Sequence, residues 1–393
     1  MTNFSGSLSP SRVFRDVNVL SPHFVPEILP FREQQINEIK GVVSSALDNK
    51  KPRNLFIYGK TGSGKTVSVK RVMELFNSET PQASMQYINC RIYNSRYRIL
   101  QKALKNFVPE LEKSGFGLTF LYEKMIEIAG KGHQLILILD EIDMIKDLDE
   151  LIYTLTRAND EIKTGGVSIV GISNKLSFKD VLDPRSKSSL YETEMIFPPY
   201  TSEQLREILK QRATSGLQKD AIDQSAINLT AAITAQENGD ARYALKLLFK
   251  AGEMADQTGR NKITDEEVEL ARKRVDIDLA SETIATLPEN HQLVLYAISN
   301  ISLNGSRYAR LEIEEEGFLF SGEVYEEYER VCKRSHKRAR SVRWYHEYLS
   351  DLEMLGLITT KMSSKGVRGH TTLIKLGHDA KDILAIVGKN TGL

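Results

Sequence analysis

The stretch Gly59-Lys60-Thr61-Gly62-Ser63-Gly64-Lys65-Thr66 decides the fold of this chain. It fits the pattern G-x-x-x-x-G-K-[ST], follows the apolar run Asn54-Leu-Phe-Ile-Tyr58 and precedes a helical pattern over residues 65–76. A strand, a glycine-rich loop and a helix in this order form a phosphate-binding loop. Its glycines let backbone N–H groups turn toward a polyphosphate, and the start of the helix adds a partial positive charge. Lys65 is expected to reach the β- and γ-phosphates, and the Thr66 hydroxyl to bind Mg²⁺.

Short apolar runs and helical patterns alternate around this loop. Further strands are predicted over residues 85–89, 135–139 and 167–172, and a further helix over residues 98–107. Strands that alternate with helices indicate a parallel sheet with crossover helices. The runs are rich in Ile, Leu and Val without polar alternation, as is typical where helices cover both faces of a sheet. The sequence therefore predicts an α/β domain.

Carboxylates stand where the strand predicted over residues 135–139 ends, in the run Asp140-Glu141-Ile142-Asp143. Ligands of open α/β sheets bind at the carboxyl ends of the strands. Asp140 is suited to hold a metal ion and its waters, and Glu141 to polarise an attacking water. Acidic pairs at strand ends also occur as simple solvated caps, but this pair follows a phosphate-binding loop.

The rest of the chain changes pattern twice. After Phe197-Pro-Pro-Tyr200 the predicted strands stop and an all-helical domain follows, with helix starts at Thr201 or Ser202 and at Thr264. Its helices are predicted over residues 202–214, 222–236, 241–258 and 264–274.

From about Asp276 a third domain is predicted, which ends in a helix followed at once by a β-hairpin. This is the order of a winged helix-turn-helix. Its helices are predicted over residues 282–298, 322–330 and 341–355, and its strands over residues 357–362 and 371–376. With 393 residues, the chain is long enough for three domains, predicted over residues 1–198, 199–275 and 276–393.

Four landmarks of the first two domains resemble those of AAA+ ATPases in order and spacing. They are the Walker A run at residues 59–66, the Walker B run at residues 140–143, Gly171-Ile-Ser-Asn174, and Gly239-Asp-Ala-Arg242. Three further stretches resemble the archaeal replication-initiator family related to the eukaryotic origin recognition complex and its partner loader. They are Val25-Pro-Glu-Ile-Leu-Pro-Phe-Arg-Glu33, Asp183-Pro-Arg-Ser-Lys-Ser-Ser-Leu190 and Phe197-Pro-Pro-Tyr200, and the similarity covers nearly the whole chain.

This resemblance implies an AAA+ P-loop ATPase domain with helices on both sheet faces, an all-helical lid and a C-terminal winged helix. It implies ATP/ADP and Mg²⁺ as cofactors, with Thr66 and Asp140 as metal ligands. Arg32 and Tyr200 are expected near the adenine beside the loop residues Gly59, Lys60, Thr61, Gly62, Ser63, Gly64, Lys65 and Thr66, although family members often carry His where Phe31 stands. Packing between domains is the alternative for Tyr200.

The catalytic residues that the resemblance implies are Glu141, Asn174 as sensor 1, Arg242 as sensor 2, and Arg185 as an arginine finger for a neighbour's nucleotide. Alternatives stay open for the last three. Asn174 could cap a turn, Arg242 could pair with an acid of its own lid, and Lys187 lies in the same segment as Arg185.

Charge is distributed unevenly along the C-terminal domain. The whole chain has a formal net charge of +1, from 53 basic and 52 acidic residues, which taken alone argues against a nucleic-acid partner. Residues 276–329 hold 2 basic and 12 acidic side chains, a net −10, whereas residues 330–393 hold 13 basic and 5 acidic, a net +8. A local DNA-binding surface is therefore predicted in the last segment.

The helix predicted over residues 341–355 is the expected recognition helix. Its core stripe is predicted to be Val342, Tyr345, Leu349, Leu352 and Leu355, which leaves Arg340, Arg343, Trp344 and Glu347 on another face for a major groove. Basic side chains near the helix start would neutralise phosphates, and the wing would reach a minor groove. The expected contacts are Lys337, Arg338, Arg340, Arg343, Trp344, Lys365 and Arg368. A solvated charged face or a protein-interaction module is the alternative.

A second basic surface is predicted on the helix over residues 98–107. Arg98, Lys102 and Lys105 share one face, while Leu100, Leu104 and Phe107 occupy another. In the resembled family an extra helical element at this location touches DNA, although an ordinary amphipathic helix has the same pattern. Two contacts from one chain would permit DNA bending or untwisting.

The resemblance implies a DNA replication initiator that binds duplex origin DNA under the control of its ATP/ADP state. A paralogous initiator and the replicative helicase are the expected protein partners, and hydrolysis is expected to be slow with tight ADP retention. The alternative is an ATP-controlled transcription regulator or protein-interaction scaffold with a winged helix. Such regulators commonly carry long helical repeats, whereas seventeen residues follow Leu376. A clamp loader would carry Ser-Arg-Cys where residues 186–189 read Ser-Lys-Ser-Ser.

Composition predicts a soluble protein of a reducing compartment. The longest apolar run, Leu135 to Leu139, is too short to span a bilayer, and residues 1–20 hold no signal-peptide core. Two distant cysteines, Cys90 and Cys332, cannot form a disulfide framework. We therefore expect a cytoplasmic, nucleoid-associated protein without a membrane partner.

Overall fold

The computed structural model describes residues 11–112, 115–175, 182–190, 192–305, 317–362 and 371–392, without the side chains of Glu112, Arg185, Ser188 and Ser189. It divides the chain into two compact units, Met1–Glu269 and Leu270–Leu393. The border between the units falls inside one helix, α10 (Asp265–Thr286). The finer domain boundary expected after residue 198 stays a prediction.

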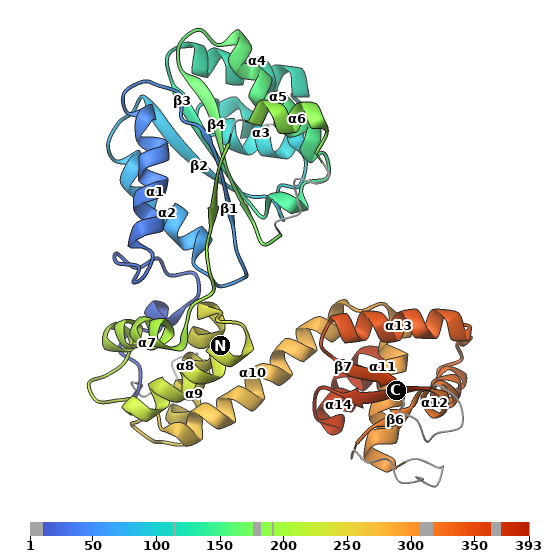
Figure 1. The fold of residues 1–393 in the computed structure, drawn as a ribbon. Helices are drawn as coiled ribbons and strands as arrows, with labels where there is room; N and C mark the ends of the chain where they lie inside the picture. Colours follow the sequence, from blue (N-terminus) through green and yellow to red (C-terminus); the bar gives the residue numbers. More distant parts are fainter. Residues whose placement is uncertain are drawn as a thin grey trace, which may run out of the picture. The chain divides into compact units, whose positions relative to one another are not determined.

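A five-stranded parallel sheet forms the centre of the first unit (Figure 1). Its order is β2-β3-β4-β1-β5, which confirms the predicted parallel α/β sheet. The fifth strand was not predicted: it lies at the sheet edge beside β1, and Met195 is its one buried residue. The strands are β1 (Asn54–Tyr58), β2 (Ala83–Asn89), β3 (Gln134–Asp140), β4 (Gly166–Ser173) and β5 (Glu192–Ile196).

Helices cover both faces of this sheet. Because successive side chains of a strand point to opposite faces, one strand contributes to the packing on both. Leu135, Leu137 and Leu139 of β3 pack in one hydrophobic cluster, and Ile136 and Ile138 pack in another. Each fully buried Leu or Ile contributes about 1.5–3 kcal/mol. The first cluster includes residues of α3 (Arg96–Leu104), α4 (Leu118–Gly130), α5 (Leu148–Glu161) and α6 (Pro184–Leu190), and the second of α1 (Glu33–Val43) and α2 (Lys65–Asn77).

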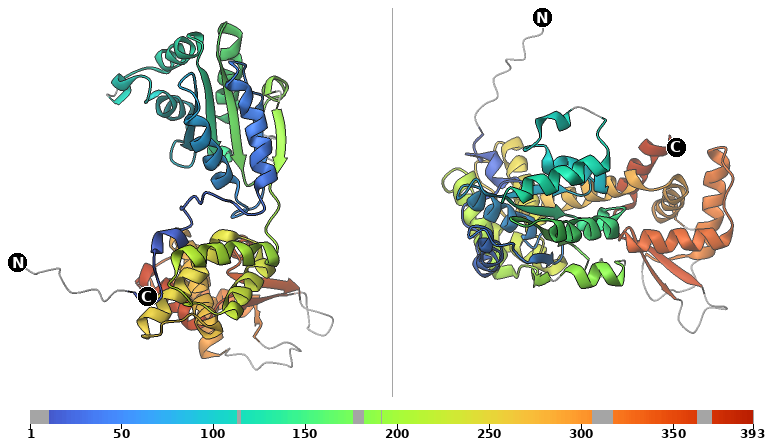
Figure 2. Two further views of the ribbon diagram at one scale, coloured as in Figure 1. Left: turned by 90° about the vertical axis from the view of Figure 1, so that its left-hand side faces the viewer. Right: turned by 90° about the horizontal axis from the view of Figure 1, so that it is seen from above.

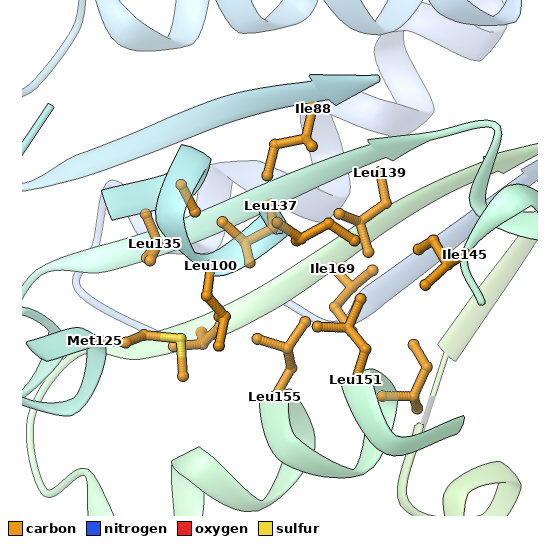
Figure 3. Packing of buried hydrophobic residues seen from close by; sticks show 14 of the residues in the cluster. Ile88, Leu100, Met125, Leu135, Leu137, Leu139, Ile145, Leu151, Leu155 and Ile169 are labelled. Atoms are coloured by element: carbon orange, nitrogen blue, oxygen red, sulfur yellow. The ribbon is translucent and has the colours of Figure 1, made fainter. Parts of the chain in front are cut away.

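The first of these clusters is drawn in Figure 3, where Leu100 of α3, Met125 of α4 and Leu151 and Leu155 of α5 point toward the leucines of β3. Figure 2 shows α1 and α2 on the other side of the strands. The sheet is therefore packed on both faces, which leaves the loops at its strand ends free to form a site.

Three helices of the first unit follow the sheet, and each agrees with a predicted helix: α7 (Ser202–Gly216), α8 (Gln224–Glu237) and α9 (Ala241–Gln257). Thr201 caps α7, because its side chain accepts from Gln204 N while the Gln204 side chain accepts from Thr201 N. At Thr264 the backbone N–H and the hydroxyl both donate to Glu267 at the start of α10. Both predicted helix starts are confirmed.

The second unit has the winged-helix order that the sequence predicts (Figure 1). Its antiparallel sheet has the order β6-β8-β7, and the two-residue strand β6 was not predicted. Its elements after α10 are α11 (Glu289–Asn304), β6 (Leu319–Phe320), α12 (Ser321–Arg334), α13 (Val342–Met354), β7 (Ile358–Met362), β8 (Thr372–Leu376) and α14 (Ala380–Thr391).

Two predictions for this unit are wrong. The helix expected over residues 282–298 is divided, because Pro288 lies between the end of α10 and the start of α11. The core stripe of α13 is Tyr345, Tyr348, Leu349 and Leu352, whereas Val342 and Leu355 are 50% and 48% exposed. These two residues flank the buried turns of the helix, Val342 as its first residue and Leu355 beyond its last.

Short 3₁₀ helices complete the described elements: η1 (Val17–Leu20), η2 (Ser44–Ala46), η3 (Pro109–Glu112) and η4 (Ile142–Met144). Cys90 and Cys332 are both buried free thiols. Within the described ranges, every helix is too short or too polar to cross a membrane.

Candidate functional site

The phosphate-binding loop joins the end of β1 to the start of α2, as the sequence predicts. Gly62 and Gly64 have φ angles of +69° and +93°, a region that side chains disfavour. A methyl group on Gly64 would lie 2.6 Å from the hydroxyl oxygen of Tyr200, and one on Gly62 would overlap with the carboxylate of Asp240. The glycines are therefore required both by backbone conformation and by close neighbours.

Lys65 directs its ammonium into the loop. Nζ donates to the carbonyl oxygens of Gly59 at 2.6 Å and Lys60 at 2.9 Å, and to Oδ1 of Asn174 at 2.8 Å. Burial, and next the charge of Arg242, lower the pKa of Lys65 to about 8. Asp140 and other acids act in the opposite direction. A phosphate group would supply the negative charge that this buried ammonium lacks.

Thr66 and Asp140 meet at the position where a metal ion is expected. Oγ1 of Thr66 donates to the two carboxylate oxygens of Asp140 at 3.0 and 3.2 Å. Tyr87 of β2 donates to Oδ2 of the same carboxylate at 2.7 Å, and burial and Asp140 raise the pKa of this phenol. Mg²⁺ is commonly held by one or two protein oxygens together with nucleotide phosphates, and this pair of oxygen ligands fits that pattern. Sequence reasoning missed Tyr87, because a tyrosine in a strand carries no spacing signal.

Glu141 follows Asp140 in a left-handed conformation, with φ 56° and ψ 48°. Its Oε2 atom is buried and has no hydrogen-bond partner among the described residues. A buried carboxylate oxygen without a donor is costly, so this atom is suited to accept from a water or ligand that enters the cleft. The strained backbone turns the side chain at the end of β3, where the sequence analysis places the water-polarising group.

The structure brings both predicted sensor residues, but not the predicted arginine finger, to this loop. Asn174 lies one residue beyond β4 and accepts from Lys65. Arg242 stands in the first turn of α9 and lines the cleft together with Lys65 and Glu141. Arg185 lies in α6, and its side chain is outside the described part of the chain.

The start of α9 contacts the phosphate-binding loop directly. Ala241 N donates to Gly62 O at 3.2 Å, and Asp240 caps the helix by accepting from the backbone N–H of Arg242 at 2.7 Å. The hydrogen bond from Ala241 to Gly62 thus connects the start of α9 to the phosphate-binding loop, and it fixes where Arg242 enters the cleft. Asp240 was not predicted as a site residue, although it stands inside the quoted run Gly239-Asp-Ala-Arg242.

Two cavities meet at the loop. The polar one is lined by the loop, Asp140, Glu141 and Asn174. The second is lined by residues of the segment 22–30 and by lid residues, and the two share Pro22, His23, Gly62, Gly64, Thr66, Lys70 and Arg242. A continuous cleft with a charged end and a more apolar end fits the phosphates and the base of a nucleotide. The residues of α7 and α9 that line the second cavity are Ile208, Gln211, Arg212, Ala241, Arg242 and Leu245, of which only Arg242 was predicted.

Arg32 and Tyr200, expected near the adenine, lie against each other. The guanidinium of Arg32 is 3.9 Å from the centre of the Tyr200 ring, and Tyr200 lines the apolar cavity. Arg32 is 1% exposed and donates to the carbonyl oxygens of Ser63 at 2.9 Å, Pro198 at 2.7 Å and Phe31 at 2.9 Å. The structure therefore shows Arg32 as a support of the phosphate-binding loop, and its contact with a nucleotide stays a prediction.

Family models match three parts of the chain. They are an AAA domain over residues 48–177, a Cdc6 AAA+ ATPase-type lid domain over residues 206–273, and a CDC6 C-terminal winged helix domain over residues 282–386. The ORC1-type DNA replication protein 1 of Sulfurisphaera tokodaii is 38% identical over 387 residues, which cover 98% of this chain and 95% of that protein. This chain belongs to the family of ORC1-type DNA replication proteins.

Another curated relative and a solved structure support the same family assignment. The ORC1-type DNA replication protein 1 of Archaeoglobus fulgidus is 37% identical, with 97% of this chain and 92% of that protein covered. The Orc1 protein of Aeropyrum pernix, solved in complex with DNA, shares 32% identity and a TM-score of 0.79 over 97% of this chain and 98% of that one. The resemblance to the archaeal initiator family and the predicted fold class are confirmed.

The first candidate DNA surface of this ORC1-type protein lies on α3. Arg98, Lys102 and Lys105 are exposed, while Leu100 and Leu104 are fully buried. Ser95 caps the start of the helix by accepting from the backbone N–H of Arg98. The helix ends at Leu104, three residues before the predicted end. The amphipathic division is as expected, and the contact with DNA stays a prediction.

The second candidate surface surrounds the turn between α12 and α13. Arg338, Arg340, Arg343 and Trp344 are exposed, and Trp344 is 51% exposed although it is a large apolar side chain. Lys337 forms an ion pair with Glu289 at the start of α11. Lys365 and Arg368, predicted on the wing, lie outside the described residues.

Proposed function

We propose that this chain is an initiator of DNA replication that binds duplex origin DNA and is switched by its bound adenine nucleotide. The observation that carries the proposal is the pairing of two features in one family member. A polar cleft around Lys65 and Asp140 fits nucleotide phosphates, and an exposed basic surface precedes the helix in the recognition position of a winged helix.

In the nucleotide site, each residue has a distinct task. The loop N–H groups and Lys65 bind the phosphates, and Thr66 and Asp140 hold Mg²⁺, which neutralises phosphate charge when bound. The free carboxylate oxygen of Glu141 accepts from a water and orients it for attack. Asn174 and Arg242 contact the last phosphate, so that its presence or loss changes the contacts of β4 and of the lid.

Slow hydrolysis is part of this proposal. An arginine finger supplied by a neighbouring molecule is worth several orders of magnitude in rate, so the isolated chain would turn over slowly. Arg185 is the candidate for this role, and tight ADP retention follows from the family resemblance. The nucleotide would then act as a switch rather than as a continuous source of work.

In the DNA site, the basic side chains of α3 and of the turn before α13 neutralise phosphates, and Arg343 and Trp344 lie at base edges in the major groove. A paralogous initiator and the replicative helicase are the protein partners that fit this role, in the cytoplasm and on the nucleoid.

Binding to duplex DNA over a range of salt concentrations tests the proposal. Each neutralised phosphate adds about 0.9 to the slope of log affinity against log salt. We expect a slope of several units and discrete protected repeats in footprints at a replication origin. Binding that does not weaken with salt would refute the proposal, and protection confined to promoters would favour a transcription regulator instead.

A further inference from the structure

The turn between α12 and α13, residues 335–341, carries the basic side chains Lys337, Arg338 and Arg340. We call it the basic turn. Arg340 is the last residue before Ser341, the N-cap of α13, and the Ser341 side chain makes no capping hydrogen bond. The position of the helix start must therefore be set by other contacts.

Two tyrosines of α12 hold the backbone of Arg340 from both sides. The Tyr325 hydroxyl donates to Arg340 O at 2.9 Å. The Tyr328 hydroxyl accepts from Arg340 N at 3.2 Å. Because Tyr325 and Tyr328 are three residues apart, they lie on one face of α12, and both peptide groups that flank the Arg340 side chain are fixed to that face.

The tyrosines are themselves fixed. Tyr328 is fully buried and donates to Oδ1 of Asn290 at 3.1 Å, which connects it to the first turn of α11. Its ring lies 6.1 Å from that of Tyr325 and 6.3 Å from that of Tyr345, centre to centre. The two hydroxyls are thus presented from a packed aromatic cluster, which restricts their rotation.

The basic turn also forms an ion pair with the start of α11. Lys337 pairs with Glu289, the neighbour of Asn290 at the start of α11. The turn is therefore held by side chains from α11 and α12 while the side chain of Arg340 remains exposed. These contacts with α11 and α12 do not use the hydrogen-bond donors of the Arg340 guanidinium.

We propose that Tyr325 and Tyr328 are positioning residues for DNA binding, which hold the backbone of Arg340 so that its guanidinium and the start of α13 meet DNA in a fixed arrangement. The inference rests on the proposed function, since it names residues that support the same DNA-binding surface. Neither tyrosine contacts DNA in this proposal; both act through Arg340.

The physical reason is preorganisation. A basic turn without these bonds would have to be ordered when DNA binds, and that ordering lowers affinity. The number of phosphates neutralised would not change, because the charges of the turn are unaltered. A positioning residue and a phosphate contact are therefore distinguishable: loss of the first lowers affinity at an unchanged salt slope, and loss of the second lowers the slope.

The test measures binding of a fluorescently labelled duplex by the full chain and by three variants over a range of salt concentrations. Tyr325→Phe removes one hydroxyl from a partly exposed site, so the fold should be retained. We expect it to weaken binding about three- to tenfold, the range that one hydrogen bond represents, with an unchanged slope. Arg340→Ala should reduce the slope by about 0.9.

Tyr345→Phe is the matched control. It removes a phenol hydrogen bond of the same kind in the same cluster, from the Tyr345 hydroxyl to Ser321 O at 3.1 Å, but it leaves the basic turn untouched. We expect lower thermal stability with unchanged DNA affinity. Equal weakening of binding in Tyr345→Phe and Tyr325→Phe would overturn the inference, because general loosening would then explain both.

An unchanged affinity in Tyr325→Phe, with Arg340→Ala still lowering the slope, would also overturn it. If the unaltered chain does not bind DNA in a salt-dependent way, the proposed function fails. The hold on the turn is then tested separately by fluorescence anisotropy decay of Trp344, the one tryptophan of the chain. Faster local motion in Tyr325→Phe but not in Tyr345→Phe supports the hold, and equal motion in all variants refutes it.

Discussion

Lys65 Nζ lies 2.8 Å from Asn174 Oδ1, and this hydrogen bond joins the phosphate-binding loop to the end of β4. The ammonium has three donors, and its other two are used on the carbonyl oxygens of Gly59 and Lys60. A phosphate that accepts from Lys65 must displace one of these acceptors. We expect Asn174 to be displaced, because a side-chain amide can rotate more easily than two carbonyls of the loop backbone.

Nucleotide binding should depend on pH through Lys65. Burial, and then the charge of Arg242, lower the pKa of Lys65 to about 8, so the free protein loses this positive charge as pH rises through that value. A bound phosphate favours the charged form and raises the pKa again, so binding near pH 8 is coupled to proton uptake. Titration with fluorescent ADP should show affinity that falls from pH 7 to pH 9.5. Lys65→Ala should bind weakly at every pH, and a flat profile in the unaltered chain would contradict the prediction.

Asn174→Ala should separate binding from hydrolysis. The change removes one acceptor of Lys65 and leaves the two carbonyls in place, so we expect ATP affinity to stay within about threefold. Hydrolysis should fall about 10- to 100-fold if Asn174 positions the last phosphate and the water. Single-turnover hydrolysis and equilibrium binding measure the two effects. Glu141→Gln is the comparison: it should bind ATP normally and hydrolyse it still more slowly, and normal hydrolysis there would show that another group polarises the water.

Gly62→Ala should separate the lid from the phosphate-binding loop. A methyl group there would overlap with the carboxylate of Asp240, which cannot retreat without losing its cap on α9. Because α9 carries Arg242, we expect nucleotide affinity to fall at least tenfold. Gly132→Ala is the control, since Gly132 also has a positive φ, of +89°, but has nothing within 4 Å of the added methyl. Gly132→Ala should lose about 1–2 kcal/mol of stability and bind nucleotide normally. Equal affinities in the two variants would show that the overlap is irrelevant.

The sequence predicts the parts of the site whose chemistry dictates a spacing. Lys65, Thr66 and Asp140 come together as expected, because a phosphate loop and an acidic strand end must meet at the same edge of a parallel sheet. The adjacent edge strand β5 escaped prediction, since a half-exposed strand lacks the continuous apolar run of a central one.

Contacts between distant segments could not be predicted from pattern. Arg212 is buried in the lid and donates to Val19 O at 2.9 Å and to Phe24 O at 3.2 Å, yet a lone arginine in an amphipathic helix indicates only a solvated face. The same holds for the bonds of Tyr325 and Tyr328 to Arg340, which depend on how α12 and the basic turn fold against each other. Periodicity identifies the buried face of a helix, but it does not say which backbone atom a buried polar group will reach.

A substitution of Arg32 tests whether this buried side chain stabilises the phosphate-binding loop. Its buried guanidinium donates to the carbonyl oxygens of Ser63, Pro198 and Phe31 and lies over the Tyr200 ring. Arg32→Met keeps an unbranched apolar side chain and leaves all three carbonyls without this donor. We expect the free energy of unfolding to fall by about 3 kcal/mol and nucleotide affinity to fall with it, because Ser63 belongs to the loop.

Arg15→Met is the matched control for this change. Arg15 also donates to backbone carbonyls, those of Thr214 and Ser215, but it is exposed, so water can replace its bonds. Denaturant unfolding and ADP binding should show a loss below about 1 kcal/mol and unchanged affinity for Arg15→Met. If Arg32→Met is as stable as Arg15→Met but binds nucleotide more weakly, Arg32 contacts the nucleotide instead of supporting the loop, because removal of a direct contact lowers affinity without removing a structural bond.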